Sequence, residues 1–279
     1  MAESIAAILQ KYQTQKRAAG YSQSTIDRVV GNLSQYSREM HVRSINRITT
    51  ESVLLWGGNK LAAGRSSSTV YAYYNSVRSF AVFAESLGHD MAALDRSRVK
   101  CRPHYGTRTF LRPFQVRRVI NHSDDRTAAL IRLLFTSGCR ISEAISITRD
   151  QVVESTDLTI YIVGKGGKTR PVFITKRIKE ELIELSDGGE YCFTDERGGR
   201  MSRSIAYYWI KKAMMSAGFG FASPHSLRRS FVTTMLVRGA DVSHVQRMSG
   251  HSSIATTQLY AQLMIDDIRK AHRKYLVEV

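Results

Sequence analysis

The sequence predicts a mainly α-helical protein with a small β-sheet, in which an N-terminal helical bundle precedes a C-terminal α+β domain. Its 279 residues, 43% of them hydrophobic, suffice for one large domain or two modest ones. Apolar residues recur at helical spacing from Ile5 to Phe83, whereas strand-like alternation joins helical patterns after Phe114. We therefore expect two domains and a linker, at 1–95, 113–279 and 96–112.

The N-terminal bundle is expected to contain about four helices. Gly20, the polar turn around Ser44 and the stretch 64–68 interrupt the helical periodicity. Ser22 and Thr50 each precede an apolar run at helical spacing, as N-cap residues do. The resulting bundle of roughly 90 residues has an ordinary size for one domain.

A basic segment joins the two predicted domains. From Arg96 to Arg118 the chain carries Arg and Lys but no acidic residue, and Pro103, Gly106 and Pro113 interrupt regular structure. Such a run is often a solvated connector, but beside the phosphate-handling residues described below we favour contact with a phosphate backbone. The candidate DNA-contacting residues are Arg96, Arg98, Lys100, Arg102, Arg108 and Arg112.

The C-terminal domain is expected to begin with helices at about 115–122 and 124–137 and a third starting near Arg140. Leu158–Val163 and Arg170–Ile174 flank a glycine-rich turn, which predicts a β-hairpin. The remaining predicted elements are a helix at 176–186, a short strand at Tyr191–Thr194, helices at 202–217, 224–238, 241–249 and 253–263, and an amphipathic segment at Ile265–Leu276.

The charge balance points to a polyanionic partner. Lys and Arg number 41 against 24 Asp and Glu, a formal net charge of +17. Nucleic acid is the expected partner. A basic surface that is merely solvated is the alternative.

Cysteine usage and hydropathy bear on the compartment. Cys101, Cys139 and Cys192 are far apart and form no C-x-x-C pair, so neither a disulfide framework nor a zinc site is expected. The N-terminus lacks a basic region and a cleavage-like site, and no stretch approaches the ~20 apolar residues of a membrane span. We expect a cytoplasmic protein without membrane contact.

Two arginines are candidates for holding a phosphodiester. Direct attack on phosphorus adds negative charge to the equatorial oxygens, which need fixed donors. Arginine donates two parallel hydrogen bonds and stays charged at working pH. Arg140 and Arg228 are assigned this role, because Arg228 lies three residues after His225 on one predicted helix face. Glu143, about one turn after Arg140, is expected to brace it.

Tyr260 is the candidate nucleophile. A phenol with an ordinary pKa near ~10 needs a base or cationic surroundings to attack at neutral pH. His225 is expected to accept or relay its proton, whereas His251 either donates to a phosphate oxygen or orients the array. A half-buried structural tyrosine is the alternative, since the chain has 13 tyrosines.

The leaving deoxyribose oxygen requires a general acid. Lys165 in the glycine-rich turn suits that role, since an arginine does not readily release a proton. Lys168 in the same turn is the rival, and simple phosphate binding is the alternative for both. The scheme needs no metal and no cofactor, and no clustered Asp and Glu pattern for magnesium is visible.

These residues together resemble the tyrosine recombinase family, also called phage integrases. The resemblance extends over essentially the whole chain. It rests on Thr136–Glu143 around Arg140, on Lys165, on His225-Ser226-Leu227-Arg228, and on Gly250-His251 with Tyr260 nine residues later. Arg229 and Cys139 depart from the family's common His and Leu, but remove no catalytic group. The compact length is similar to Xer-type and small transposon or phage members.

The resemblance implies a function and an assembly. Arg140 and Arg228 would bind the scissile phosphate, Lys165 would be the general acid, His225 and His251 would assist, and Tyr260 would form a 3′-phosphotyrosine. A helical core-binding domain and a catalytic domain would clamp DNA. Four protomers, with or without a paralogous recombinase or accessory proteins, would act through a Holliday junction, and the C-terminal helix would dock on a neighbour.

Site-specific recombination is therefore the expected function, in a bacterial, archaeal, phage or mobile-element protein. A type IB topoisomerase-like enzyme shares the chemistry but relaxes supercoils as a monomer. A catalytically silent DNA-binding protein of the same fold is the second alternative, since function resides in the site and not in the fold.

Overall fold

The computed structural model describes residues 3–102, 109–164, 167 and 169–250. The chain forms two compact units, Met1–Thr107 and Arg108–Val279. The division falls inside the segment 96–112. Val99 is buried in the core of the first unit and Leu111 in that of the second.

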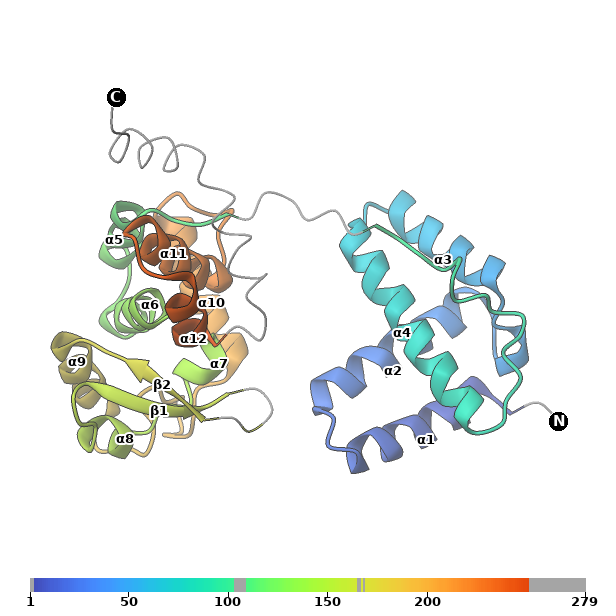
Figure 1. The fold of residues 1–279 in the computed structure, drawn as a ribbon, viewed down its shortest axis with the longest axis horizontal. Coiled ribbons are helices and arrows are strands. Elements are labelled where there is room, and N and C mark those ends of the chain that lie inside the picture. Colours follow the sequence, from blue (N-terminus) through green and yellow to red (C-terminus); the bar gives the residue numbers. More distant parts are fainter. Residues whose placement is uncertain (1–2, 103–108, 165–166, 168, 251–279) are drawn as a thin grey trace, which may run out of the picture. The chain divides into compact units, whose positions relative to one another are not determined.

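Unit 1 is a bundle of helices (Figure 1), namely α1 (Ile5–Ala18), α2 (Gln23–Glu39), the 3₁₀ turn η1 (Ile45–Arg47), α3 (Thr50–Ala62) and α4 (Ser67–Ser86). Polar caps start the helices: the Ser66 hydroxyl accepts from Thr69 N, and Thr49 and Ser52 cap α3 reciprocally. Helix α4 packs against α1, α2 and α3. The helical bundle predicted from Ile5 onward is therefore present.

Unit 2 combines helices with one antiparallel hairpin (Figure 1). Its elements are α5 (Pro113–Asn121), α6 (Asp125–Ser137), α7 (Ile141–Ala144), α8 (Arg149–Val153), β1 (Thr159–Val163), β2 (Thr169–Phe173), α9 (Lys176–Ser186), α10 (Arg203–Ser216), α11 (Pro224–Val237) and α12 (Val242–Ser249). Helix α6 lies at the centre and contacts α5, α7, α9, α10 and α11. This mainly helical fold with a small sheet confirms the predicted fold class.

The hairpin has a definite inner face. Ile160 pairs with Val172 and Ile162 pairs with Arg170, and the three aliphatic side chains are buried. Tyr161, Val163 and Phe173 point to the exposed face. Because side chains alternate along a strand, Arg170 shares the buried face with Val172.

One predicted element is wrong. Tyr191–Thr194 forms no strand, only isolated bridges from Tyr191 to Thr148 and from Thr194 to Arg200. Cys192 and Phe193 are fully buried, so the apolar run reflects packing of an irregular segment into the core. The predicted helix at 253–263 and the segment Ile265–Leu276 lie outside the described residues. Among the described helices, none is long and apolar enough to cross a bilayer.

Candidate active site

Three of the predicted catalytic residues lie in the described part of unit 2. Arg140 is the N-cap residue of α7, and His225 and Arg228 lie on α11. Lys165, Lys168, His251 and Tyr260 lie outside the described residues, as does Arg108 of the basic segment.

A glycine corner between α6 and α7 places Arg140. Gly138 ends α6 with φ +63°, a left-handed conformation that glycine adopts without steric cost. A Cβ there would also collide with the Phe231 ring of α11. The corner therefore fits closely against α11 two residues before Arg140.

Glu143 holds Arg140 in a fixed orientation. Arg140 Nη1 donates to Glu143 Oε1 at 2.7 Å, and the Arg140 backbone N–H donates to Oε2 at 2.7 Å. The Glu143 residue is only 6% exposed. Burial by itself raises the pKa of its carboxyl, but the Arg140 backbone hydrogen bond and the charge of Arg170 outweigh it and lower the pKa. Glu143 is therefore ionised at neutral pH.

Arg228 is a buried cation with an unused donor. It is 7% exposed, and its Nη1 donates to the Gly138 carbonyl oxygen. Its Nη2 is buried and finds no hydrogen-bond partner among the described residues. Burial, and then repulsion from Arg140, lowers the pKa of Arg228 to about 10, so the group stays charged at pH 7. A buried donor without a hydrogen-bond partner destabilises the fold, and binding of an anion at Nη2 would remove that cost.

His225 lies in the first turn of the same helix, near several positive charges. Burial, followed by the charges of Arg229 and Arg203, lowers the pKa of His225 below its ordinary value. The imidazole is therefore neutral at pH 7 and has a nitrogen able to accept a proton. Arg203 was not singled out from the sequence, and Arg229 was noted only as a departure from the family's common His.

Arg170 is the site residue that the sequence did not reveal. Its Nη2 donates to Glu143 Oε2 at 2.8 Å, so the Glu143 carboxylate forms ion pairs with both Arg140 and Arg170. Among the described groups, the guanidiniums of Arg140 and Arg170 contact the Glu143 carboxylate, and Arg228 lies close enough for the charges of all three groups to shift its pKa. This excess of positive charge fits a phosphodiester that gains negative charge during attack. The sequence signal for Arg170 was its position in the predicted strand 170–174, two residues before Val172 and so on the same face of the strand.

The basic segment makes local ion pairs. Arg96 lies 2.7 Å from Glu85, and Arg98 lies 4.0 Å from Glu51, both on exposed surfaces. Arg112 is the N-cap residue of α5, while Lys100 and Arg102 are exposed. Exposed pairs of this kind contribute little to stability and can exchange for phosphate contacts.

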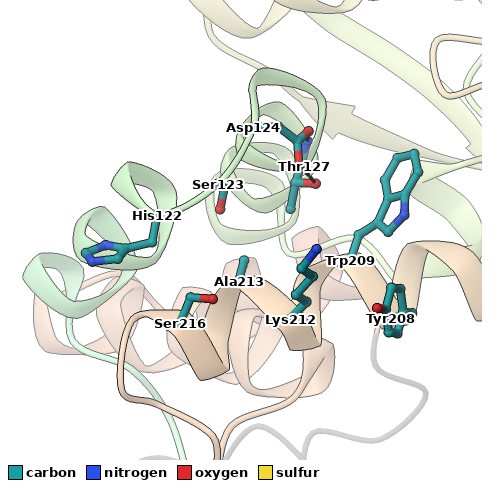
Figure 2. A pocket seen from close by; sticks show the side chains of 9 residues that line it. All are labelled: His122, Ser123, Asp124, Thr127, Tyr208, Trp209, Lys212, Ala213 and Ser216. Carbon is teal, nitrogen blue, oxygen red and sulfur yellow. Dashed lines mark hydrogen bonds between the residues drawn. The ribbon is translucent and has the colours of Figure 1, made fainter.

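A separate hollow of about 290 Å³ lies between the α5–α6 turn and α10 (Figure 2). His122 and Asp124 line one side, and Tyr208 and Lys212 line the other. Asp124 is already occupied as the cap of α6, accepting from the Thr127 backbone and hydroxyl. None of the predicted catalytic residues within the described part of the chain lines the hollow. The Asp124 carboxylate that lines it already accepts hydrogen bonds from Thr127.

Comparisons with known proteins agree on one family. The model described as "Phage integrase family" matches residues 109–265. The chain is 41% identical to "Tyrosine recombinase XerD" of Corynebacterium glutamicum over 160 residues, which cover 54% of this chain and 52% of that protein. That alignment spans only about half the relative's length. "Tyrosine recombinase XerA" of Thermococcus onnurineus is 29% identical over 280 residues, covering 98% of this chain and 96% of that protein.

Solved structures share the fold. A lambda integrase tetramer bound to a Holliday junction has a TM-score of 0.77 at 14% identity, covering 93% of this chain and 77% of that one. XerA recombinase has a TM-score of 0.55 at 20% identity, covering 98% and 100% of the two chains.

Proposed function

This chain belongs to the phage integrase family, and on that premise we propose that it is a site-specific DNA recombinase that acts through a 3′-phosphotyrosyl intermediate. The observation that carries the proposal is that Arg140, His225 and Arg228 lie close enough together in unit 2 for the charges of the two arginines to lower the pKa of His225. The XerD and XerA relatives are named tyrosine recombinases, which supports the same reaction here.

In the proposed cleavage step, the Tyr260 phenolic oxygen attacks the scissile phosphorus. A tyrosine–phosphorus bond forms as the phosphorus–5′ oxygen bond breaks, and the phenolic proton passes to neutral His225. Arg140 and Arg228 hold the two non-bridging oxygens, while Glu143 keeps Arg140 in place. His251 donates to a phosphate oxygen or orients the array.

The departing 5′ oxygen takes a proton from Lys165, or from Lys168 in the same turn. The phosphotyrosyl bond conserves the energy of the broken linkage. A 5′ hydroxyl from another strand can therefore attack it and release Tyr260, which joins the strands without a nucleotide cofactor.

The substrate and assembly follow from charge and from the relatives. A net charge of +17 suits double-stranded DNA, with unit 1 and the basic segment contacting its backbone. The lambda integrase structure is a tetramer on a Holliday junction, and we extend that assembly to this chain. The predicted domain roles (DNA binding at 1–95, catalysis at 113–279) and a cytoplasmic location belong to the same proposal.

Capture of DNA tests the nucleophile. Protein is incubated with sheared DNA of its source genome and denatured in SDS, and DNA that remains attached is sequenced. We expect recovered fragments to share a short inverted repeat. Tyr260→Phe should abolish capture, whereas Tyr208→Phe, at an exposed tyrosine of α10, should retain it. Capture that persists in Tyr260→Phe contradicts the assignment.

Two further measurements separate neighbouring functions. Relaxation of unrelated supercoiled plasmids at equal rates would indicate a topoisomerase instead of a recombinase. Lys165→Ala should be rescued by a substrate with sulfur in place of the 5′ oxygen, because a thiolate leaves without a proton. No rescue points to Lys168 or to a purely electrostatic role.

A further inference from the structure

Arg170 connects three parts of unit 2 that are distant in sequence. It extends from β2 to Glu143 of α7, and its Nη1 donates to the Met248 carbonyl oxygen at the end of α12. Its side chain is only 12% exposed. Burying a guanidinium is costly unless its donors are used, and two of its nitrogens are used on these two elements.

The end of α12 is built around this side chain. Gly250 caps α12 with φ +61°, and a Cβ there would lie 2.9 Å from both Cδ and Nε of Arg170. The Gly250 carbonyl oxygen accepts from Arg140 Nη2 at 3.0 Å. Two arginines therefore hold the last turn of α12, directly before His251 in the sequence.

Glu143 couples those two arginines. Its Oε1 accepts from Arg140 and its Oε2 accepts from Arg170, so each cation fixes the carboxylate for the other. Without Arg170, Glu143 Oε2 would keep only the Arg140 backbone N–H, and the Arg140 guanidinium would be the only one of the two cations left in contact with the carboxylate. Arg140 would then be drawn towards Glu143 and away from a phosphate.

We propose that Arg170 is a positioning residue for the recombination reaction: it fixes Glu143 against Arg140 and holds the Gly250 turn that leads to His251. The inference rests on the proposed function. Arg170 touches no reacting atom in this scheme and acts through Arg140 and the α12 turn. Together with the left-handed φ of Gly250, the contact explains the glycine at this position, because a Cβ would also displace the Arg170 side chain.

A double-mutant cycle between Arg170 and Gly250 tests this contact. The readout is the single-turnover rate of covalent adduct formation on a nicked duplex containing the fragment that the wild type captures best. Arg170→Ala and Gly250→Ala should each slow cleavage on the order of 30-fold, within the range of couplings between touching residues. Gly250→Ala should cost much less when Arg170 is already alanine, because the collision is gone.

Gly239→Ala is the matched control for the backbone. Gly239 also has a left-handed φ, of +88°, but a Cβ there meets nothing within 4 Å. Gly239→Ala therefore tests the cost of placing alanine at a left-handed φ without a collision. The cleavage rate of this variant should stay within about threefold of wild type. If the effects of Arg170→Ala and Gly250→Ala simply multiply in the double variant, the proposed contact is not what matters.

A positioning role for Arg170 also requires that its substitution affect the cleavage rate more than the DNA affinity. Arg170→Ala should leave DNA affinity within about threefold at matched salt while cleavage slows, since a positioning residue acts on the reacting geometry. Arg170→Lys keeps one charge but not the two-sided contact and should recover only part of the rate. It also replaces Arg170→Ala if that variant lacks a melting transition. Arg177→Ala, at an exposed arginine of α9, serves as the charge control.

The outcomes distinguish the two proposals. If wild-type protein captures no DNA, the proposed function fails. If the wild type forms the adduct and Arg170→Ala or Arg170→Lys does so at the same rate, the function stands and the positioning role is wrong.

Discussion

The two units differ in the polar side chains that they bury. Unit 1 packs the rings of Tyr36 and Tyr73 against Trp56, and the Trp56 and Tyr36 rings meet edge to face at 5.3 Å. Within its described residues, the buried polar side chains are the small hydroxyls of Thr50 and Ser76. Unit 2 instead buries the charges of Glu143 and Arg228.

This difference indicates where function resides. Burying a charge costs more than burying an apolar side chain of similar size, and a buried ion pair is weak evidence for stability. Unit 1 keeps its comparable pair, Glu39 and Lys60, nearer the surface, with Glu39 accepting from Trp56 Nε1 at 2.7 Å. Under the proposed function, the buried cation Arg228 of unit 2 serves an anionic ligand, and Glu143 serves to hold the neighbouring arginines.

The largest effect on this comparison should come from Trp56→Ala. Removing a fully buried indole leaves a cavity and costs about 4 kcal/mol of unfolding free energy. Trp209 of unit 2 is then the remaining tryptophan. Its fluorescence should report wild-type unfolding of unit 2 in urea, while circular dichroism shows an earlier transition.

The control for Trp56→Ala is Tyr21→Ala, at a residue that is 50% exposed, which should stay within ~0.5 kcal/mol of wild type. Equal destabilisation by the two substitutions would contradict the view that unit 1 is stabilised by its aromatic interior.

Arg228→Ala should reverse the pattern, with a large loss of activity and a smaller loss of stability. Removing one preorganised donor costs about 3 kcal/mol of transition-state stabilisation, or roughly 100-fold in cleavage rate. The unfolding midpoint should fall less than in Trp56→Ala, because repulsion between Arg228 and Arg140 is relieved. Rates come from single-turnover adduct formation, with exposed Arg238→Ala as control. If Arg228→Ala cleaves DNA at the wild-type rate but has a lowered unfolding midpoint, Arg228 has a structural role only.

Local patterns in the sequence predicted much of unit 2, but not its internal contacts. Helix α9 occupies the predicted 176–186, and the hairpin strands begin and end within one residue of prediction, since alternation and a glycine turn are local signals. Tyr191–Thr194 was misassigned because a short apolar run does not reveal whether it pairs. Arg170 was missed because its inward direction depends on the hairpin register and its partners lie on α7 and α12.

Ser230→Ala tests a hydrogen bond that unit 2 places in its core. The Ser230 hydroxyl accepts from the Leu111 backbone N–H at 2.7 Å and donates to Ser226 O at 2.7 Å. Alanine leaves the buried Leu111 donor unsatisfied, which should cost about 2 kcal/mol. Urea unfolding followed by Trp209 fluorescence measures the loss, and exposed Ser204→Ala should show none. No change in Ser230→Ala would mean that water replaces the hydroxyl.

The smallest effect concerns the protonation of His225. Burial and the surrounding arginines hold its folded pKa below 6.5, so the unfolded chain binds the proton more readily. The stability due to this group is therefore present above about pH 6.5 and is lost as the pH falls towards the folded pKa. NMR titration of the imidazole should give a midpoint below 6.5.

Arg203→Gln should raise the His225 midpoint, because it removes a nearby positive charge, and Arg200→Gln should not. The Arg203 shift should also shrink at high salt, since Arg203 is exposed. A midpoint above 6.5 in the free protein would contradict the lowered pKa, and a midpoint well above 7 would leave the imidazole protonated at neutral pH and exclude His225 as the acceptor of the Tyr260 proton.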